Sequence, residues 1–189
     1  MDILLSSAYL APIQYYTKLQ QCNGTAYIEA CDNYSKQTYR NRCIIVDANG
    51  PLALTIPTEK TAEGKCLMRD IRISDHGNWR HLHWRALQSA YGNSPFFEYY
   101  EDDFRRFYQP DWEFLTDYNR DLMTLVCELL DITPRITNTE KFQAVPSMEF
   151  QGVAPRPYYQ VFSARHGFIP DLSIVDLLFN MGPESVLYL

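Results

Sequence analysis

The sequence predicts a single α/β domain, with a βαβ unit and a hairpin in its N-terminal half and a mostly helical C-terminal half. Two short apolar runs, separated by a helix-length segment, open the chain at residues 3–28, which is typical of parallel βαβ units. After Trp79 the apolar residues recur every three and four positions, which indicates amphipathic helices. A length of 189 residues suits one domain.

The βαβ unit begins with residues 3–5, a short apolar run that reads as a buried strand. Pro12 suits the first turn of a helix, and Asn23-Gly24 suits its end. Residues 26–28 then form a second short strand. This order predicts that the two strands are parallel neighbours in one sheet.

A β-hairpin is the next element. Residues 43–47 and 52–56 read as strands and flank Asn49-Gly50, two residues that tolerate the positive φ of a tight turn. Pro57 ends the second of these strands because it lacks a backbone N–H. The hairpin is the clearest local signal in the chain.

Residues 58–73 give a weaker signal. The segment 58–66 is polar and reads as an exposed loop. We expect residues 68–73 to form a further strand, with Ile71 and Ile73 on one face.

Three helices are predicted between residues 79 and 131. The first covers residues 79–90, and its apolar face consists of Trp79, Leu82, His83, Ala86, Leu87 and Ala90. The second begins with Ser94 as N-cap and Pro95 at its first position. Its apolar face consists of Phe97, Tyr100, Phe104 and Phe107. The third lies within residues 112–131 and turns inward Leu115, Tyr118, Leu122, Leu125, Val126 and Leu129.

The C-terminal part combines an irregular segment with one more helix. Residues 133–170, which include Pro155-Arg156-Pro157, are expected to wrap the surface in extended form. A final helix begins at Ser173, with Asp176 three residues on as in a capping box, and ends at Gly182-Pro183. Its apolar face consists of Ile174, Leu177 and Leu178.

Composition excludes several classes of protein. The net charge of −6 and the pI of about 5.2 argue against nucleic-acid binding. No apolar run approaches the roughly 20 residues of a membrane span, and the first residues lack the basic region of a secretion signal. Five cysteines without a C-x-x-C pair indicate reduced thiols. We therefore expect a cytoplasmic protein without cofactor or metal.

Motifs of common enzymes are absent, including the phosphate-binding and dinucleotide-binding glycine loops and the G-x-S-x-G elbow. His81 and His83 do not predict a metal site, because residues two apart on a helix point in nearly opposite directions. His83 belongs to the apolar face of its helix and His81 to the opposite side.

The densest group of polar side chains is the segment 32–42, DNYSKQTYRNR, which follows the second predicted strand. Open α/β sheets bind their ligands at the carboxyl ends of the strands, which is where this segment lies. Arg and Lys suit an anionic group, Asn and Gln suit sugar hydroxyls, and Tyr suits a ring. Tyr9 and Gln14, from the loop and helix after the first predicted strand, face the same edge. The candidate ligand-binding residues are therefore Tyr9, Gln14, Tyr34, Lys36, Arg40, Asn41 and Arg42. The alternative is a solvated turn without function.

Four long strings resemble the WbqC-like protein family: SSAYLAPIQYYTKL, EACDNYSKQTYRNRCII with its NGPLALTIP hairpin, HWRALQSAYGNSPFFEYY, and QVFSARHGFIPDLSIVDLLFNMGPES. The resemblance covers nearly the whole chain. It implies a role in the synthesis of bacterial surface polysaccharide, such as the O-antigen of lipopolysaccharide. It supplies no catalytic residues.

Two functions follow as hypotheses. In the first, the protein is a transferase acting on a nucleotide-activated sugar or another anionic precursor, with Asp32 or His81 as the base. In the second, it is a non-catalytic scaffold of the same pathway that contacts other proteins through exposed aromatic residues. A homodimer formed through the apolar C-terminal residues 186–189 is a further possibility.

Overall fold

The computed structural model describes residues 1–60, 66–145, 153–154 and 156–189. In this part of the chain, β1 (Ile3–Ser6), β2 (Thr25–Glu29) and β5 (Arg135–Asn138) form a parallel sheet in the order β1-β2-β5. Helix α1 (Ile13–Gln21) connects the first two strands, which pair with Ile3 opposite Ala26. The predicted βαβ unit is confirmed.

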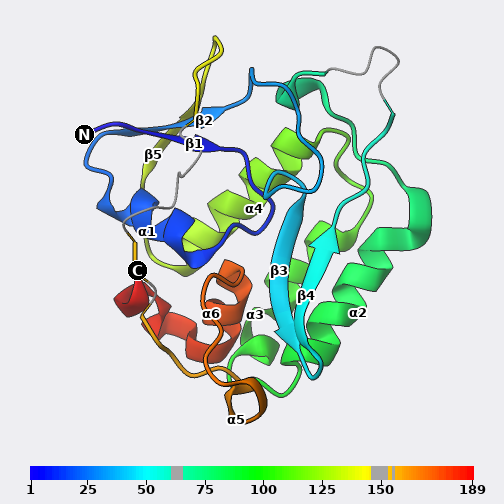
Figure 1. Ribbon diagram of the computed structural model, residues 1–189, viewed down its shortest axis with the longest axis vertical. Helices are drawn as coiled ribbons and strands as arrows, with labels where there is room; N and C mark the ends of the chain where they lie inside the picture. The colour runs from blue at the N-terminus through cyan, green and yellow to red at the C-terminus, as the bar shows by residue number, and fades with distance from the viewer. Residues whose placement is uncertain (61–65, 146–152, 155) are drawn as a thin grey trace.

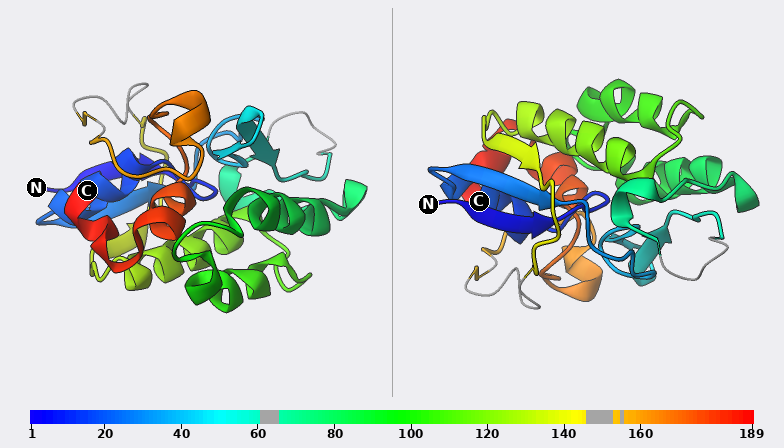
Figure 2. Two further views of the ribbon diagram at one scale, coloured as in Figure 1. Left: turned by 90° about the horizontal axis from the view of Figure 1, so that it is seen from below. Right: turned by 90° about the horizontal axis from the view of Figure 1, so that it is seen from above.

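One face of the parallel sheet is covered by helices. Along β2, Ala26 and Ile28 are buried whereas Thr25 and Tyr27 are partly exposed, which is the alternation of a strand with one covered face. Helices α1 and α4 (Leu115–Leu129) lie on the same side of the sheet in Figure 1. Seen from above, the strands lie side by side in front of the helices (Figure 2, right).

Strand β5 falls in the segment that was expected to be irregular. It pairs with β2 from Thr25 opposite Arg135 to Ile28 opposite Asn138. Three of its four side chains are exposed and Ile136 is its one apolar residue. A strand at the edge of a sheet with so little apolar surface gives no periodic signal.

The hairpin is confirmed, but its turn lies one residue earlier than predicted. Strands β3 (Arg42–Asp47) and β4 (Gly50–Thr55) are antiparallel, and Asp47 pairs with Gly50. The turn is therefore Ala48-Asn49, and Oδ1 of Asp47 accepts a hydrogen bond from the Asn49 N–H at 2.6 Å. Gly50 has the positive φ, at 114°.

The strand expected at residues 68–73 is wrong. Met68–Asp70 form a short 3-10 helix, η1, and the following residues make only isolated bridges, Arg72 with Phe114 and Thr58 with Ile73. The inward direction of Ile71 and Ile73 is confirmed, because both are buried. The loop 58–66 lies in part outside the described residues.

Helix α2 (Trp79–Tyr91) follows the 3-10 turn η2 (His76–Asn78) and buries four of the six side chains of its predicted apolar face, Trp79, His83, Leu87 and Ala90. Leu82 was assigned to the apolar face but is 59% exposed. Trp84, which lies outside the predicted face, is buried, and the buried residues of the helix recur mainly at steps of three and four. His83 is buried and His81 is exposed, as predicted.

Helix α3 (Phe97–Arg105) continues into η3 (Arg106–Tyr108), and the four predicted aromatic residues of this segment are buried. Ser94 is not its N-cap, because the helix begins three residues later and the Ser94 hydroxyl donates to the Tyr91 carbonyl at 2.7 Å. Helix α4 starts at Leu115 and buries five of the six side chains predicted to face inward, with Leu129 half-buried.

The C-terminal helix α6 (Ile174–Met181) follows a single turn, α5 (Ser163–His166), and precedes η4 (Gly182–Tyr188). Its predicted bounds and apolar face are confirmed, whereas its capping box is not. The Ser173 hydroxyl donates to the Leu10 carbonyl at 2.7 Å. Asp176 is wholly buried in the core.

Asp176 connects α6 to α2 and to the segment before α5. Tyr91 donates to Oδ1 of Asp176 at 2.8 Å, and Tyr158 donates to Oδ2 at 2.6 Å. Nε2 of Gln160 also donates to Oδ2, at 3.0 Å. Burial raises the pKa of this carboxyl group, and the three donors oppose the rise.

Candidate functional site

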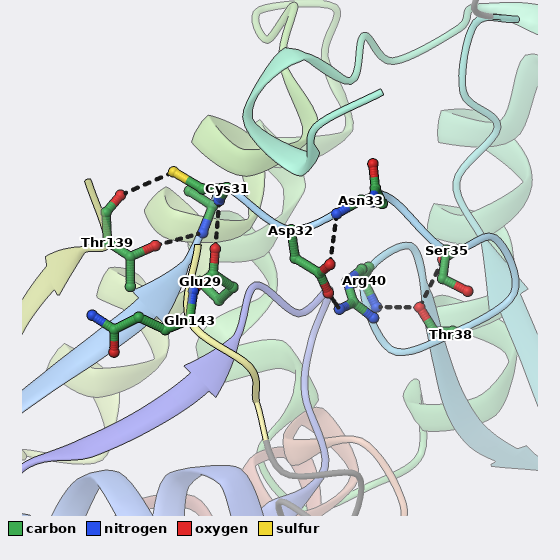
Figure 3. A network of polar contacts seen from close by, with 10 residues as sticks. Glu29, Cys31, Asp32, Asn33, Ser35, Thr38, Arg40, Thr139 and Gln143 are labelled. Carbon is green, nitrogen blue, oxygen red and sulfur yellow. Dashed lines mark hydrogen bonds and ion pairs between the residues drawn. The ribbon is translucent and has the colours of Figure 1, made fainter. Parts of the chain in front are cut away.

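The loop after β2 holds the predicted Asp32 and Arg40 side by side (Figure 3). Nη2 of Arg40 lies 2.9 Å from Oδ2 of Asp32, and the side chains are 15% and 29% exposed. Oδ1 of Asp32 accepts the N–H of Asn33 at 2.7 Å. Both carboxylate oxygens are therefore occupied, which fits a positioning role better than that of a base.

Asn41 and Arg42 connect this loop to the hairpin. Nδ2 of Asn41 donates to the Ile56 carbonyl at 2.9 Å, and its Oδ1 accepts the N–H of Gln37 at 3.1 Å. Nε of Arg42 donates to Oγ1 of Thr55 at 2.9 Å. The side chains of Asn41 and Arg42 thus stabilise the local fold of the loop and the hairpin.

Tyr34 and Lys36 complete the predicted group in this loop. Lys36 is exposed and Tyr34 is half-buried. Burial raises the pKa of Tyr34, and Thr58 and the charge of Arg40 oppose the rise. Tyr34 thus lies near the Arg40 guanidinium.

The side chains of Tyr9 and Gln14 have their hydrogen-bond partners outside this loop, although the Tyr9 N–H donates to the Tyr39 carbonyl within it at 2.8 Å. The hydroxyl of Tyr9 is buried and lies 3.1 Å from Nδ1 of His83 and 3.1 Å from the hydroxyl of Tyr108. Gln14 donates a hydrogen bond to Asp171 in the C-terminal part of the chain. The structure therefore brings together Asp32, Tyr34 and Arg40 and separates Gln14 from them.

Among the described residues, the cavity at the carboxyl ends of the parallel strands is small. The Glu29 carboxylate is buried there and accepts the N–H groups of Cys31 at 2.6 Å and Gln143 at 2.8 Å (Figure 3). The cavity between Ser7, Asn119 and the strand ends has a volume of about 10 Å³. That volume holds about one water molecule.

A much larger cleft lies where α2 begins and η3 ends. Its volume is about 420 Å³. We call it the α2 cleft; its lining residues are Asp75, Asn78, Trp79, Arg80, His81, Trp84, Arg105, Tyr108, Gln109 and Pro110. Among the predicted site residues, His81 lines this cleft and Asp32 does not.

The walls of the α2 cleft combine aromatic rings with cations. The ring centroids of Trp84 and Tyr108 are 5.5 Å apart, and the guanidinium of Arg80 lies 4.8 Å from the Trp79 ring. Arg105 is exposed and makes no ion pair within the described part of the chain. Arginine and aromatic rings together suit a ligand that is both anionic and cyclic.

Behind the cleft lies a buried chain of polar groups, Tyr108, Tyr9 and His83. Burial lowers the pKa of His83 to about 4, although the Thr55 carbonyl opposes the shift, so the imidazole is neutral near neutral pH. Burial also raises the pKa of Tyr108 and Tyr9. Through these uncharged groups, Tyr108, which lines the cleft, is connected to Tyr9 in the loop after β1 and to His83 on α2.

Sequence reasoning missed the α2 cleft apart from His81. Its residues come from segments 75–84 and 105–110, which meet only because α2 packs against η3. Trp79, Arg80 and His81 in a row, with Trp84 next along the helix, were the available signal. The apolar periodicity assigns Trp79 to the core and leaves Trp84 outside the predicted face.

The described residues contain neither a metal cluster nor a membrane-spanning helix. No group of three or more His, Cys, Asp or Glu side chains there is arranged to hold a metal ion. Within the same residues, no helix has both the length and the apolar character needed to cross a membrane. All five cysteines are free thiols, as expected.

Comparisons with known proteins give one family and one relative. The model of the WbqC-like protein family matches residues 7–147 and 140–188. Uncharacterized protein Rv1507c of Mycobacterium tuberculosis (strain ATCC 25618 / H37Rv) is 28% identical over 193 residues, which cover 82% of this chain and 83% of the relative. No solved structure matches the chain.

Proposed function

This chain belongs to the WbqC-like protein family, and we propose that it is a transferase of surface-polysaccharide synthesis that binds a nucleotide-activated sugar in the α2 cleft. The observation that carries the proposal is the lining of that cleft, in which Trp79, Trp84 and Tyr108 accompany Arg80 and Arg105. Its volume of about 420 Å³ is in the range of small-molecule sites.

A nucleotide-activated sugar matches this lining group by group. Its base and sugar rings have faces that stack on tryptophan and tyrosine. Its phosphates suit guanidinium groups, which donate two parallel hydrogen bonds to neighbouring oxygens. Arg105, which has no carboxylate partner in the described residues, is the cation most readily available to them.

His81 is the residue that we assign to proton transfer. It is exposed on α2 and lines the cleft. Histidine is the side chain used most often as a general acid or base. In this proposal its imidazole accepts the proton of the sugar hydroxyl or amine as that group attacks the carbonyl carbon of an acyl or aminoacyl thioester, the second substrate. The C–S bond of the donor then breaks, and the thiolate leaves as the acyl group passes to the sugar. Asp32 keeps Arg40 in place and takes no part in the reaction.

The test is a binding screen of the whole protein against UDP-, GDP-, CMP- and dTDP-activated sugars by thermal shift, followed by calorimetry of the best ligand. Arg105→Ala and Trp84→Phe are expected to weaken binding about tenfold and about threefold, because each removes one direct contact. Arg135→Ala, which removes an exposed charge on β5, is the matched control and leaves binding unchanged.

Three results would contradict this proposal. An equal loss of affinity in Arg105→Ala and Arg135→Ala would show that only net charge matters. Binding that survives in all cleft variants would place the ligand elsewhere. A purified protein that binds no nucleotide-activated sugar and no isolated nucleotide would leave the scaffold function as the better hypothesis.

A further inference from the structure

Arg80 is the most enclosed cation of the α2 cleft. Its side chain is 14% exposed, and its guanidinium lies over the Trp79 ring. Its charge also reaches the buried phenol of Tyr118, where it opposes the rise in pKa that burial causes. The guanidinium is therefore largely shielded from solvent, and an electrostatic contact is stronger there than in water.

Asp75 is the carboxylate that pairs with this guanidinium. Nη1 of Arg80 donates to Oδ1 of Asp75, and within the described residues no other carboxylate pairs with Arg80. The Asp75 side chain is 80% exposed. The pair thus joins an enclosed cation to an anion that is almost fully hydrated.

The turn before α2 places Asp75 at the mouth of the cleft. Gly77 and Asn78 both have left-handed backbones, with φ of 76° and 49°. The Ser74 carbonyl accepts the Trp79 indole N–H at 3.0 Å, and the Ser74 hydroxyl accepts the His76 N–H at 3.2 Å. Asp75 and Asn78 from this turn both line the cleft.

We propose that Asp75 is an internal counter-ion that occupies the anion position of Arg80 and that the diphosphate of the ligand displaces it. This inference rests on the proposed function. Hydration allows Asp75 to leave at low cost, because an exposed carboxylate loses little solvation when its ion pair breaks. A ligand with a single carboxylate gains little binding free energy at Arg80, because it only replaces the carboxylate of Asp75. A diphosphate gains more, because it spans Arg80 and the unpaired Arg105.

The specificity that follows is for a diphosphate over a monocarboxylate. Inorganic pyrophosphate is the probe for the first and acetate for the second, both measured with the full chain by calorimetry. Asp75→Asn removes the counter-ion. Asp111→Asn is the matched control, because Asp111 is exposed, follows the lining residue Pro110 and gives the same change in net charge.

A second readout does not depend on any ligand. Phenylglyoxal modifies accessible arginine side chains, and mass spectrometry of the peptide that contains Arg80 gives the rate at this residue. Arg80 is expected to react faster with phenylglyoxal in Asp75→Asn than in the chain without this substitution. Asp111→Asn is expected to leave that rate unchanged.

Asp75→Asn is expected to raise the affinity for pyrophosphate about fivefold, which is the upper range for a partly exposed ion pair. An equal rise in Asp111→Asn would overturn the proposal, because net charge would then explain it. So would a fall in affinity in Asp75→Asn, since Asp75 would then orient Arg80 for the ligand.

The two readouts separate this inference from the proposed function. If no chain binds pyrophosphate or a nucleotide-activated sugar, the proposed function fails and displacement by a diphosphate fails with it. If Arg80 is then modified faster in Asp75→Asn, Asp75 does shield Arg80 and only the proposed class of ligand is wrong. If the rate of modification is unchanged, the role of Asp75 as counter-ion of Arg80 is wrong as well.

Discussion

The hydroxyl of Tyr9 lies 3.1 Å from Nδ1 of His83, a residue 74 positions further along the chain. The two rings are stacked, with centroids 5.8 Å apart. This contact joins the loop after β1 to α2, and burial lowers the pKa of the imidazole so that it stays uncharged in the interior. It has a measurable consequence for stability.

Acid is expected to destabilise the protein through His83. Its pKa falls from 6.5 to about 4 on folding, so between these values the unfolded chain binds a proton that the folded chain does not. Stability is complete above pH 6.5 and falls as the pH is lowered toward 4, by up to about 3 kcal/mol. Urea unfolding at several pH values measures it. In His83→Gln this part of the pH dependence disappears; its persistence would assign it to another group.

Asp176→Ala is expected to destabilise the protein by about 3 kcal/mol, because Tyr91, Tyr158 and Gln160 lose a buried acceptor. Asp111→Ala, on the surface, is the control and is expected to change stability by less than about 0.5 kcal/mol. The free energy of unfolding in urea measures both. Similar values for the two variants would contradict the role given to Asp176.

Two leucines of α2 provide a test of the buried face. Leu87 has no exposed surface, whereas Leu82 is 59% exposed. Leu87→Ala is expected to cost about 3 kcal/mol through lost burial and a cavity. Leu82→Ala is expected to cost less than about 0.5 kcal/mol. Thermal unfolding distinguishes them, and equal losses would mean that Leu82 is covered in solution.

Arg40→Gln separates the two candidate sites. We expect it to lower stability by about 1 kcal/mol, through loss of the partly buried ion pair with Asp32. We expect the affinity for a nucleotide-activated sugar to stay within about twofold, because Arg40 does not line the α2 cleft. A large loss of affinity in calorimetry, with the fold intact, would return the ligand site to the loop after β2.

Much of the fold could be predicted because its signals are local. The βαβ unit, the hairpin and the aromatic face of α3 each follow from residues that are neighbours in the chain. Two of the failures, at β5 and at Trp84, occurred where a distant partner decides the structure. Strand β5 exists because β2 offers it a ladder, and Trp84 is buried because η3 covers it.

The candidate site shows the same division. Asp32 and Arg40 were grouped correctly by their closeness in sequence, and they do pair. Their pairing also leaves them less available to a ligand. The α2 cleft depends on contacts between residues 75–84 and 105–110. The apolar periodicity of α2 assigns Trp79 to the core and leaves Trp84 unassigned, and it does not show that either ring borders a cavity.

The place of β5 affects how the protein folds during synthesis. Thr25 pairs with Arg135, so the sheet stays two-stranded until most of the chain has left the ribosome. During that interval β2 has an open edge, of the kind to which another extended chain can add. Pairing over so long a separation in sequence also slows folding, because a large loop must close first. Until residues 135–138 are available, the edge of β2 that later pairs with β5 therefore stays unpaired.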